Sequence, residues 1–121
     1  MKLLLALGAL NAAIAIALGA FGAHGLKAKV DDYYLGVWNT AAEYHLYHAL
    51  ALLLLGALAK LFSASGLVTS GWVIAIGTLI FSGSLYLLVL SGQRWLGAIT
   101  PFGGTILIIG WLMAAWALWK V

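Results

Sequence analysis

The first apolar stretch of the chain, residues 3–21, reads LLLALGALNAAIAIALGAF and contains no charged side chain. The hydrocarbon core of a bilayer is about 30 Å thick, so a helix needs roughly 20 residues to cross it. This stretch therefore predicts a transmembrane helix. A signal peptide cleaved near Gly22 to His24 is the weaker alternative, because the apolar run is long for a signal core.

Three further apolar stretches follow, at about 38–62, 71–90 and 99–119. Each is long enough to span a bilayer, and the short alternating segments of a β-barrel strand are missing. We therefore predict an all-α fold, an integral membrane bundle of four transmembrane helices with short loops. The bundle forms one domain over residues 1–121, and four spans place both termini on the same side.

Composition leads to the same class. Of the 121 residues, 65% are hydrophobic and 7% are charged, whereas about 25% are charged in soluble proteins. The six basic residues lie singly near the ends of apolar runs, so the net charge of +3 does not indicate a nucleic-acid-binding face. The chain has no cysteine, which excludes disulfides and thiolate metal sites. The lipid bilayer is the expected partner, and neither a cofactor nor nucleic acid is expected.

The second helix is predicted to begin before its apolar stretch. Asp31 or Asp32 is a suitable N-cap, because a short carboxylate accepts a hydrogen bond from a free N–H of the first turn. The helix would then begin in the membrane interface, and we expect Tyr34, Leu35 and Trp38 to face lipid there.

The fourth helix carries its own start signal. Thr100 is predicted to cap it, and Pro101 suits the first helical position, where no N–H is needed. Trp111 falls in the middle of this span and is expected to pack against other helices. The basic residues divide evenly between the two sides of the membrane, so the free α-amino group is the only argument for cytoplasmic termini.

Small residues mark the predicted contacts between helices. Lipid supplies no hydrophobic drive for association, so close backbone approach and interhelical hydrogen bonds must hold the spans together. Asn11 lies at mid-membrane beside a stripe in the first helix, and we expect it to find a partner there. The expected packing residues of the first and fourth helices are Gly8, Ala12, Ala15, Gly19, Gly22, Gly103 and Gly110.

The chemically richest stretch, residues 38–48, reads WNTAAEYHLYH and begins the second span. At about 100° per residue, most of its polar side chains share one half of the helix, and His45 lies just past the edge of that half. We expect this half to face protein and the leucine half to face lipid. A carboxylate at the centre of a membrane helix costs roughly 2.5 to 3.5 kcal/mol in free energy of insertion. Glu43 lies about five residues inside Trp38 and not at the centre, so its cost is smaller and one structural hydrogen bond would offset it.

A buried polar cluster is therefore predicted near the Trp38 side of the membrane. Two interpretations stay open, a structural hydrogen-bond network and a proton- or ion-linked site, because Glu and His side by side exchange a proton between pH 5 and 8. One helix cannot present a complete set of metal ligands, so no metal is predicted. No motif for catalysis or phosphate binding is present, so no catalytic residue is predicted. The expected members of the cluster are His24, Glu43, Tyr44, Tyr47, His48, Ser82 and Tyr86.

Four segments carry a family resemblance: GAFGAHGL at 19–26, the region from Trp38 to YHALAL at 47–52, FSGSLY at 81–86 and ITPFGG at 99–104. With them the chain resembles the YgdD-like small inner-membrane proteins of bacteria, a family of unknown function with a transmembrane relative in eukaryotes. The resemblance implies four membrane helices, residence in a bacterial plasma membrane and no assigned activity. It supplies no catalytic residues.

The expected function is therefore structural. Four short spans bury little within one subunit, so a non-enzymatic protein that assembles into a homo-oligomer is the first interpretation. The alternative is a small proton- or ion-linked carrier that uses Glu43 and His48 and has a hydrated cavity open to one surface. A membrane enzyme acting on lipid or quinone comes third, and it would need a pocket that opens sideways to the bilayer.

Overall fold

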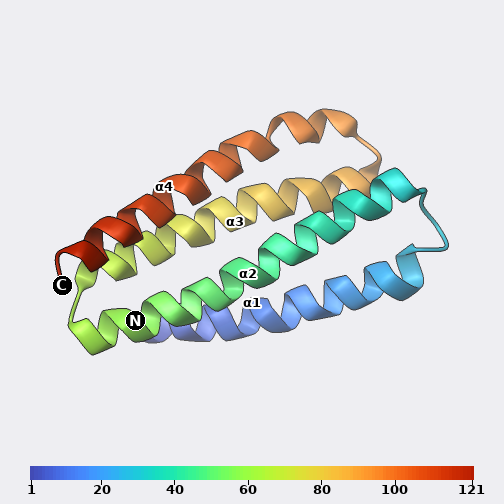
Figure 1. The fold of residues 1–121 in the computed structure, drawn as a ribbon. Helices are drawn as coiled ribbons and strands as arrows, with labels where there is room; N and C mark the ends of the chain where they lie inside the picture. The colour runs from blue at the N-terminus through green and yellow to red at the C-terminus, as the bar shows by residue number, and fades with distance from the viewer.

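The computed structural model describes residues 1–121, and all of its regular structure is helical. Each of its four long helices is long and apolar enough to cross a membrane, which confirms the all-α prediction with four spans. Figure 1 shows them running back and forth along one direction. They are α1 (Lys2–Phe21), α2 (Asp32–Phe62), α3 (Ser65–Ser91) and α4 (Thr100–Trp119).

Two short helical segments, η1 (Gly22–Leu26) and η2 (Arg94–Ala98), lie next to the long helices. The first is a π-helical turn that continues α1, and the second is a 3-10 turn before α4. α2 and α3 begin well before their apolar stretches, because hydropathy marks the hydrocarbon-crossing part of a helix and not its ends. Asp31 caps α2 as predicted, and its side chain accepts a hydrogen bond from the Tyr34 N–H at 3.1 Å.

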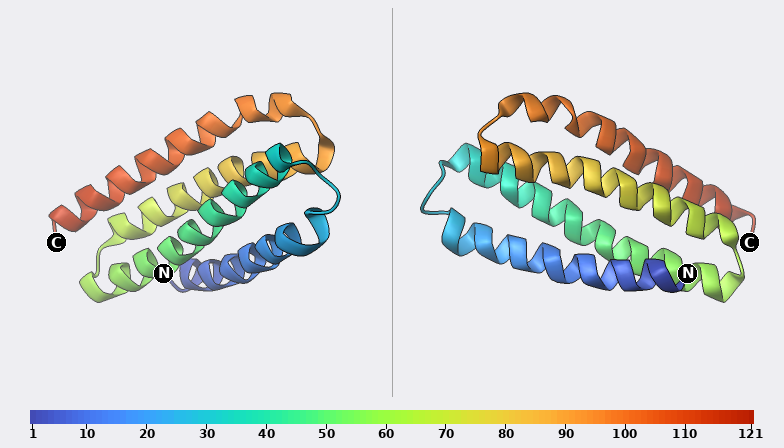
Figure 2. Two further views of the ribbon diagram at one scale, coloured as in Figure 1. Left: turned by 45° about the vertical axis from the view of Figure 1, so that its right-hand side comes forward. Right: turned by 180° about the vertical axis from the view of Figure 1, so that it is seen from behind.

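The four helices form an open row in chain order. α1 packs chiefly on α2, α2 also packs on α3, and α3 also packs on α4. Figures 1 and 2 show α1 and α4 at opposite ends of this row, so the four spans do not close into a ring. Short connections explain the order, since a short loop makes consecutive helices antiparallel neighbours.

Along the length of the helices, both chain termini lie at the same end of the bundle as the tight turn between α2 and α3 (Figure 1). We call this the terminus end. The connections between α1 and α2 and between α3 and α4 lie at the opposite end, which we call the loop end.

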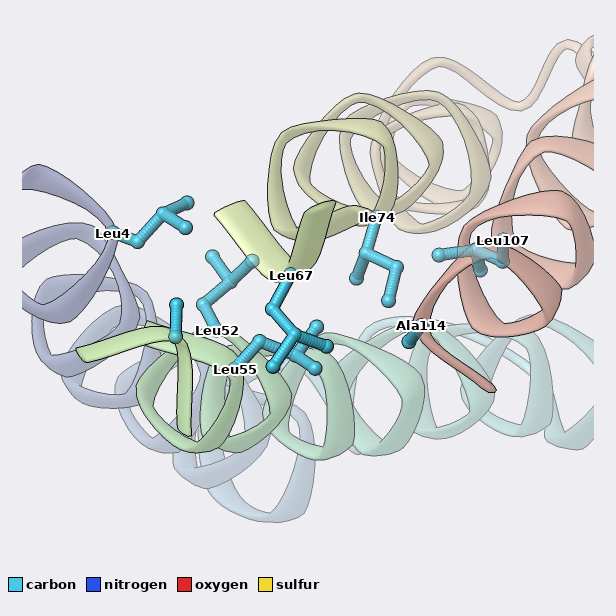
Figure 3. Close-up of a cluster of buried hydrophobic side chains, with 8 residues drawn as sticks. Leu4, Leu52, Leu55, Leu67, Ile74, Leu107 and Ala114 are labelled. Carbon is cyan, nitrogen blue, oxygen red and sulfur yellow. The ribbon is translucent and has the colours of Figure 1, made fainter. Parts of the chain in front are cut away.

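A cluster of buried apolar side chains joins the row, and all four helices contribute to it (Figure 3). These side chains gain dispersion contacts with each other, which is the main attraction available to helices that are surrounded by lipid. The cluster consists of Leu4, Leu52, Leu55, Ala59, Leu67, Ile74, Leu107 and Ala114.

Small residues allow the helix backbones to approach closely. A Cβ placed on Gly8 of α1 would lie 2.8 Å from the Ala49 carbonyl oxygen of α2, and one placed on Gly103 of α4 would lie 2.8 Å from the Phe81 Cα of α3. Neither backbone atom has room to move away. Of the predicted packing residues, Gly8, Ala15, Gly22, Gly103 and Gly110 are buried, and Asn11, Ala12 and Gly19 are half-buried.

The prediction that Trp38 faces lipid is wrong, because its side chain is only 1% exposed. Its indole N–H donates to the Leu18 carbonyl of α1 at 2.7 Å, and its ring packs against Phe21 and Tyr86. A Cβ on Gly22 would lie 2.5 Å from the Trp38 ring, so only glycine leaves space for the indole. A buried indole N–H needs an acceptor, and the carbonyl near the end of α1 supplies one.

The predicted cap of α4 is also wrong. Ile99 occupies the cap position without a side-chain bond, Thr100 is the first helical residue, and Pro101 follows it in the first turn. Instead of capping, the Thr100 hydroxyl shares a hydrogen bond with the Ser84 hydroxyl of α3 at 2.6 Å. Thr100 is half-buried, so its hydroxyl stabilises the contact between two helices.

Candidate functional site

A hydrogen-bonded chain of three side chains crosses α1, α2 and α3. The imidazole of His45 in α2 lies between Asn11 of α1 and Tyr86 of α3. His45 Nε2 is 2.8 Å from Asn11 Oδ1, and His45 Nδ1 is 3.0 Å from the Tyr86 hydroxyl. His45 is buried, while Asn11 and Tyr86 are half-buried. We call these three residues the His45 network.

The direction of each bond in the His45 network follows from Asn11. Its Nδ2 donates to the Leu7 carbonyl at 2.9 Å, so its Oδ1 is the atom that faces His45. That oxygen only accepts, which places the imidazole proton on Nε2. Nδ1 then accepts from the Tyr86 O–H. Both nitrogens of a neutral His45 are therefore satisfied within the protein.

The second buried histidine, His48, has the opposite tautomer. Its Nδ1–H donates to the Tyr44 carbonyl at 2.7 Å, and its Nε2 accepts from the Trp111 indole N–H of α4 at 3.1 Å. An indole N–H only donates, so a proton on His48 Nε2 would face another N–H. This geometry favours neutral His48. Trp111, expected only to pack, thus links α4 to α2 by a hydrogen bond.

The polar face of α3 contributes further contacts. The Ser82 hydroxyl donates to the Ala41 carbonyl of α2 at 2.9 Å, and it is buried. The Thr78 hydroxyl donates to the Ile74 carbonyl of its own helix at 2.8 Å. Ser82 therefore fixes α3 against α2, whereas Thr78 bonds only within α3. Both hydroxyl oxygens can still accept a hydrogen bond.

A groove of about 390 Å³ lies over the His45 network, between α1 and α3 with α2 as its floor. We call it the α1–α3 groove. Ile14 and Leu79 are among the side chains that form its apolar sides, and Leu79 is 74% exposed. Both residues lie well inside the apolar spans, so the groove opens sideways.

The structure separates the members of the predicted polar cluster. Glu43 is exposed on the surface of α2, and its carboxylate has no hydrogen bond or ion pair within the chain. His24 is exposed in η1. Tyr44 and Tyr47 are exposed as well. The expected buried network of these residues with His48 is therefore not formed, whereas Tyr86 is joined to His45 and Ser82 is buried between α2 and α3.

The predicted polar cluster is wrong because α2 is rotated about its axis relative to the prediction. The inward face of α2 is centred on His45 and carries Ala41, Ala49 and Leu52, which are all buried. Polarity suggested the Glu43 face, but small residues decide which faces meet in a membrane. Ala41 precedes His45 by one turn and Ala49 follows it by one turn. That spacing was the signal for His45 that the polarity argument missed.

A separate polar contact fastens the loop end, outside the apolar spans. The guanidinium of Arg94 in η2 lies 4.5 Å from the centre of the Tyr33 ring and 5.5 Å from that of Tyr34. Its Nε donates to the Tyr34 hydroxyl at 3.3 Å, and this hydrogen bond raises the pKa of Arg94. The contact connects η2 to the first turn of α2.

The model of a protein family described as "Protein of unknown function (DUF423)" matches residues 18–104. The chain belongs to this family. The DUF423 match runs from the end of α1 to the first turn of α4, so it includes His45, His48 and Tyr86, while Asn11 precedes it.

Relatives of this DUF423 protein are named membrane proteins. A UPF0382 membrane protein of Staphylococcus aureus (strain bovine RF122 / ET3-1) is 51% identical over 120 residues, which cover 99% of this chain and 98% of the relative. The UPF0382 membrane protein YwdK of Bacillus subtilis (strain 168) is 52% identical over 114 residues, covering 93% of each chain. No solved structure matches the chain. Together with the four spans, these relatives identify a small membrane protein of unassigned activity.

Proposed function

We propose that this protein is a non-enzymatic membrane protein that assembles with further copies of itself through the exposed face of α2. That face carries Thr40, Glu43, Tyr47, Leu50 and Leu54, which are all exposed. The observation that carries the proposal is the position of Glu43, a carboxylate within a spanning helix that has no partner in its own chain.

The cost of an unpartnered carboxylate favours a second copy as the occupant. A charged residue at the centre of a membrane helix costs roughly 2.5 to 3.5 kcal/mol. Glu43 lies nearer the start of α2, so its cost is smaller, and hydroxyl donors lower it further. Two copies related by an axis along the membrane normal keep every residue at the same depth. In such a dimer, the depth of Glu43 in one copy is within one helical turn of the depths of Thr40 and Tyr47 in the other copy.

The geometry of the histidines supports a non-catalytic role. Both ring nitrogens of His45 and of His48 are engaged by protein groups, which leaves neither imidazole free as a general base. Glu43 lies on the exposed face of α2 and His48 on the buried one, so these two residues do not form the shared site that the carrier alternative requires.

Cysteine crosslinking tests the assembly, because the natural chain has no cysteine. Leu54→Cys lies on the exposed face of α2, and Ile108→Cys is a control on α4; both native side chains are more than half exposed. In native membranes under oxidising conditions, we expect covalent dimers from Leu54→Cys and monomers from Ile108→Cys. Dimers from Ile108→Cys alone, or from neither variant, would rule out this face.

We also infer residence in a bacterial plasma membrane with cytoplasmic termini. Support comes from the bacterial relatives that are named membrane proteins and from the free α-amino group. The likeness to YgdD-like proteins belongs to the same inference. Its four motif segments, between residues 19 and 104, all lie inside the matched range 18–104.

A further inference from the structure

The α1–α3 groove has the size and position of a lipid-accessible binding site. Its volume of about 390 Å³ lies within the range of roughly 300 to 1,000 Å³ that is usual for small-molecule sites. It exists because α1 and α3 both pack on α2 but have little contact with each other. Its opening lies along the spans, so a ligand enters from the bilayer.

The polar groups of the groove keep unused hydrogen-bonding capacity. Asn11 Nδ2 has two hydrogens, of which one is donated to Leu7. The Tyr86 and Thr78 oxygens each donate their hydrogen within the protein and can still accept. Through these three residues the groove offers one N–H donor and two hydroxyl acceptors to a ligand.

This capacity matches a hydroxyl group, which both donates and accepts. Its O–H can bond the oxygen of Tyr86 or Thr78, and its oxygen can accept from Asn11 Nδ2. None of the residues that line the groove is Asp, Glu, Lys or Arg, so an ionised headgroup would enter without a counter-charge, which is costly in apolar surroundings. The apolar side chains of Leu7, Ile14 and Leu79 suit a hydrocarbon chain.

We propose that the α1–α3 groove binds an uncharged membrane lipid through its hydroxyl group, as a diacylglycerol would present it. The site is separate from the exposed face of α2, because it uses the opposite side of that helix. It therefore goes beyond the proposed assembly and does not depend on it.

Gly83 provides a way to close the groove without disturbing the helices. It lines the groove, and a Cβ built on it meets no atom within 4 Å. Gly83→Leu therefore places a side chain in open space. Gly36→Leu is the matched control, since its Cβ also meets nothing within 4 Å and Gly36 does not line the groove. Both substitutions raise helix propensity to a similar degree.

The experiment uses a diacylglycerol with a photoreactive acyl chain, in bilayer discs of phosphatidylcholine that contain the full chain. We expect saturable labelling of α1 and α3 peptides next to the groove, with competition by unlabelled dioleoylglycerol and none by phosphatidic acid. Gly83→Leu should weaken apparent binding by about tenfold or more, which corresponds to at least about 1.4 kcal/mol. Gly36→Leu should leave it unchanged. Circular dichroism and thermal unfolding establish that both variants fold.

Three results would overturn the inference. Labelling that does not saturate identifies ordinary surrounding lipid. Labelling that survives Gly83→Leu in a folded protein places the lipid elsewhere. If Gly83→Leu abolishes the crosslinked dimer of Leu54→Cys in a folded protein, the groove takes part in the contact between copies and is not a separate lipid site. If Leu54→Cys forms no dimer while Gly83 is unchanged, that result contradicts the proposed assembly and leaves the lipid site unaffected.

Discussion

His45 holds three helices together, because each of its ring nitrogens bonds a side chain from a different neighbouring helix. Hydrogen bonds between membrane helices contribute about 0.6 kcal/mol on average and up to about 1.7 kcal/mol. The His45 network belongs near the upper part of that range, since its central residue is only 7% exposed and loss of one partner leaves a buried nitrogen unpaired.

Tyr86→Phe tests this contribution. The substitution keeps the ring that packs on Trp38 and removes the hydroxyl that donates to His45. We expect a loss of about 1 kcal/mol in the free energy of unfolding, measured by denaturant titration in detergent. Tyr33→Phe is the control, because the Tyr33 hydroxyl has no hydrogen bond within the chain. Equal stability of the two variants would mean that the Tyr86 hydroxyl contributes nothing.

Single residues also show where sequence reasoning reaches its limit. Asn11 was expected to find an interhelical partner, but nothing in its position named His45. Glu43 was assigned to the interior because carboxylates are costly in lipid. That argument holds for a whole assembly and not for one chain, because a second subunit can cover the face that the first leaves open.

At the scale of helices, α1 and α2 approach through small side chains. Ala15 is buried against this contact, whereas Ala13 on the same helix is exposed. Ala15→Leu should therefore overfill a packed contact and cost about 1 to 3 kcal/mol, while Ala13→Leu should change stability by less than about 0.5 kcal/mol. Thermal unfolding in one detergent compares the two. If the two leucine variants unfold at the same temperature, Ala15 does not pack tightly against α2.

The start of α2 depends on its capping residue. Asp31→Ala removes the carboxylate that accepts from the Tyr34 N–H, and loss of an N-cap typically costs about 1 kcal/mol. Asp31→Asn retains an acceptor oxygen and should recover most of this loss. Hydrogen exchange of the first turn of α2, followed by mass spectrometry, should be faster in Asp31→Ala only. Equally fast exchange in both variants would point to the charge of Asp31 and not to its cap.

Helix positions were predictable, and helix rotations were not. The run at 3–21 and the acidic pair at 31 and 32 locate elements well, because length and capping depend on local chemistry. Rotation depends on which face meets another helix, and lipid and protein interior are both apolar. Trp38 illustrates the difficulty. Tryptophans gather at membrane interfaces on average, yet this one is buried between helices and its indole N–H donates to the Leu18 carbonyl.

For the whole molecule, single cysteines at the two ends of the bundle report its orientation in the membrane. Ser65 lies at the terminus end and Gln93 at the loop end, and both are exposed. With cytoplasmic termini, Gln93→Cys should react with an impermeant maleimide added to intact cells, and Ser65→Cys should react only after lysis. Reaction of Ser65→Cys in intact cells would reverse the orientation.

The open row has a consequence for biogenesis. A chain emerges from the ribosome N-terminus first, and here each helix after the first packs on the helix made just before it. The contact of Gly8 with Ala49 is complete once α2 has been inserted, and the His45 network once α3 has been inserted. α4 then docks on a finished unit of three helices. Contacts that are local along the chain form quickly. Each newly inserted span can therefore pack on a helix that is already in the membrane.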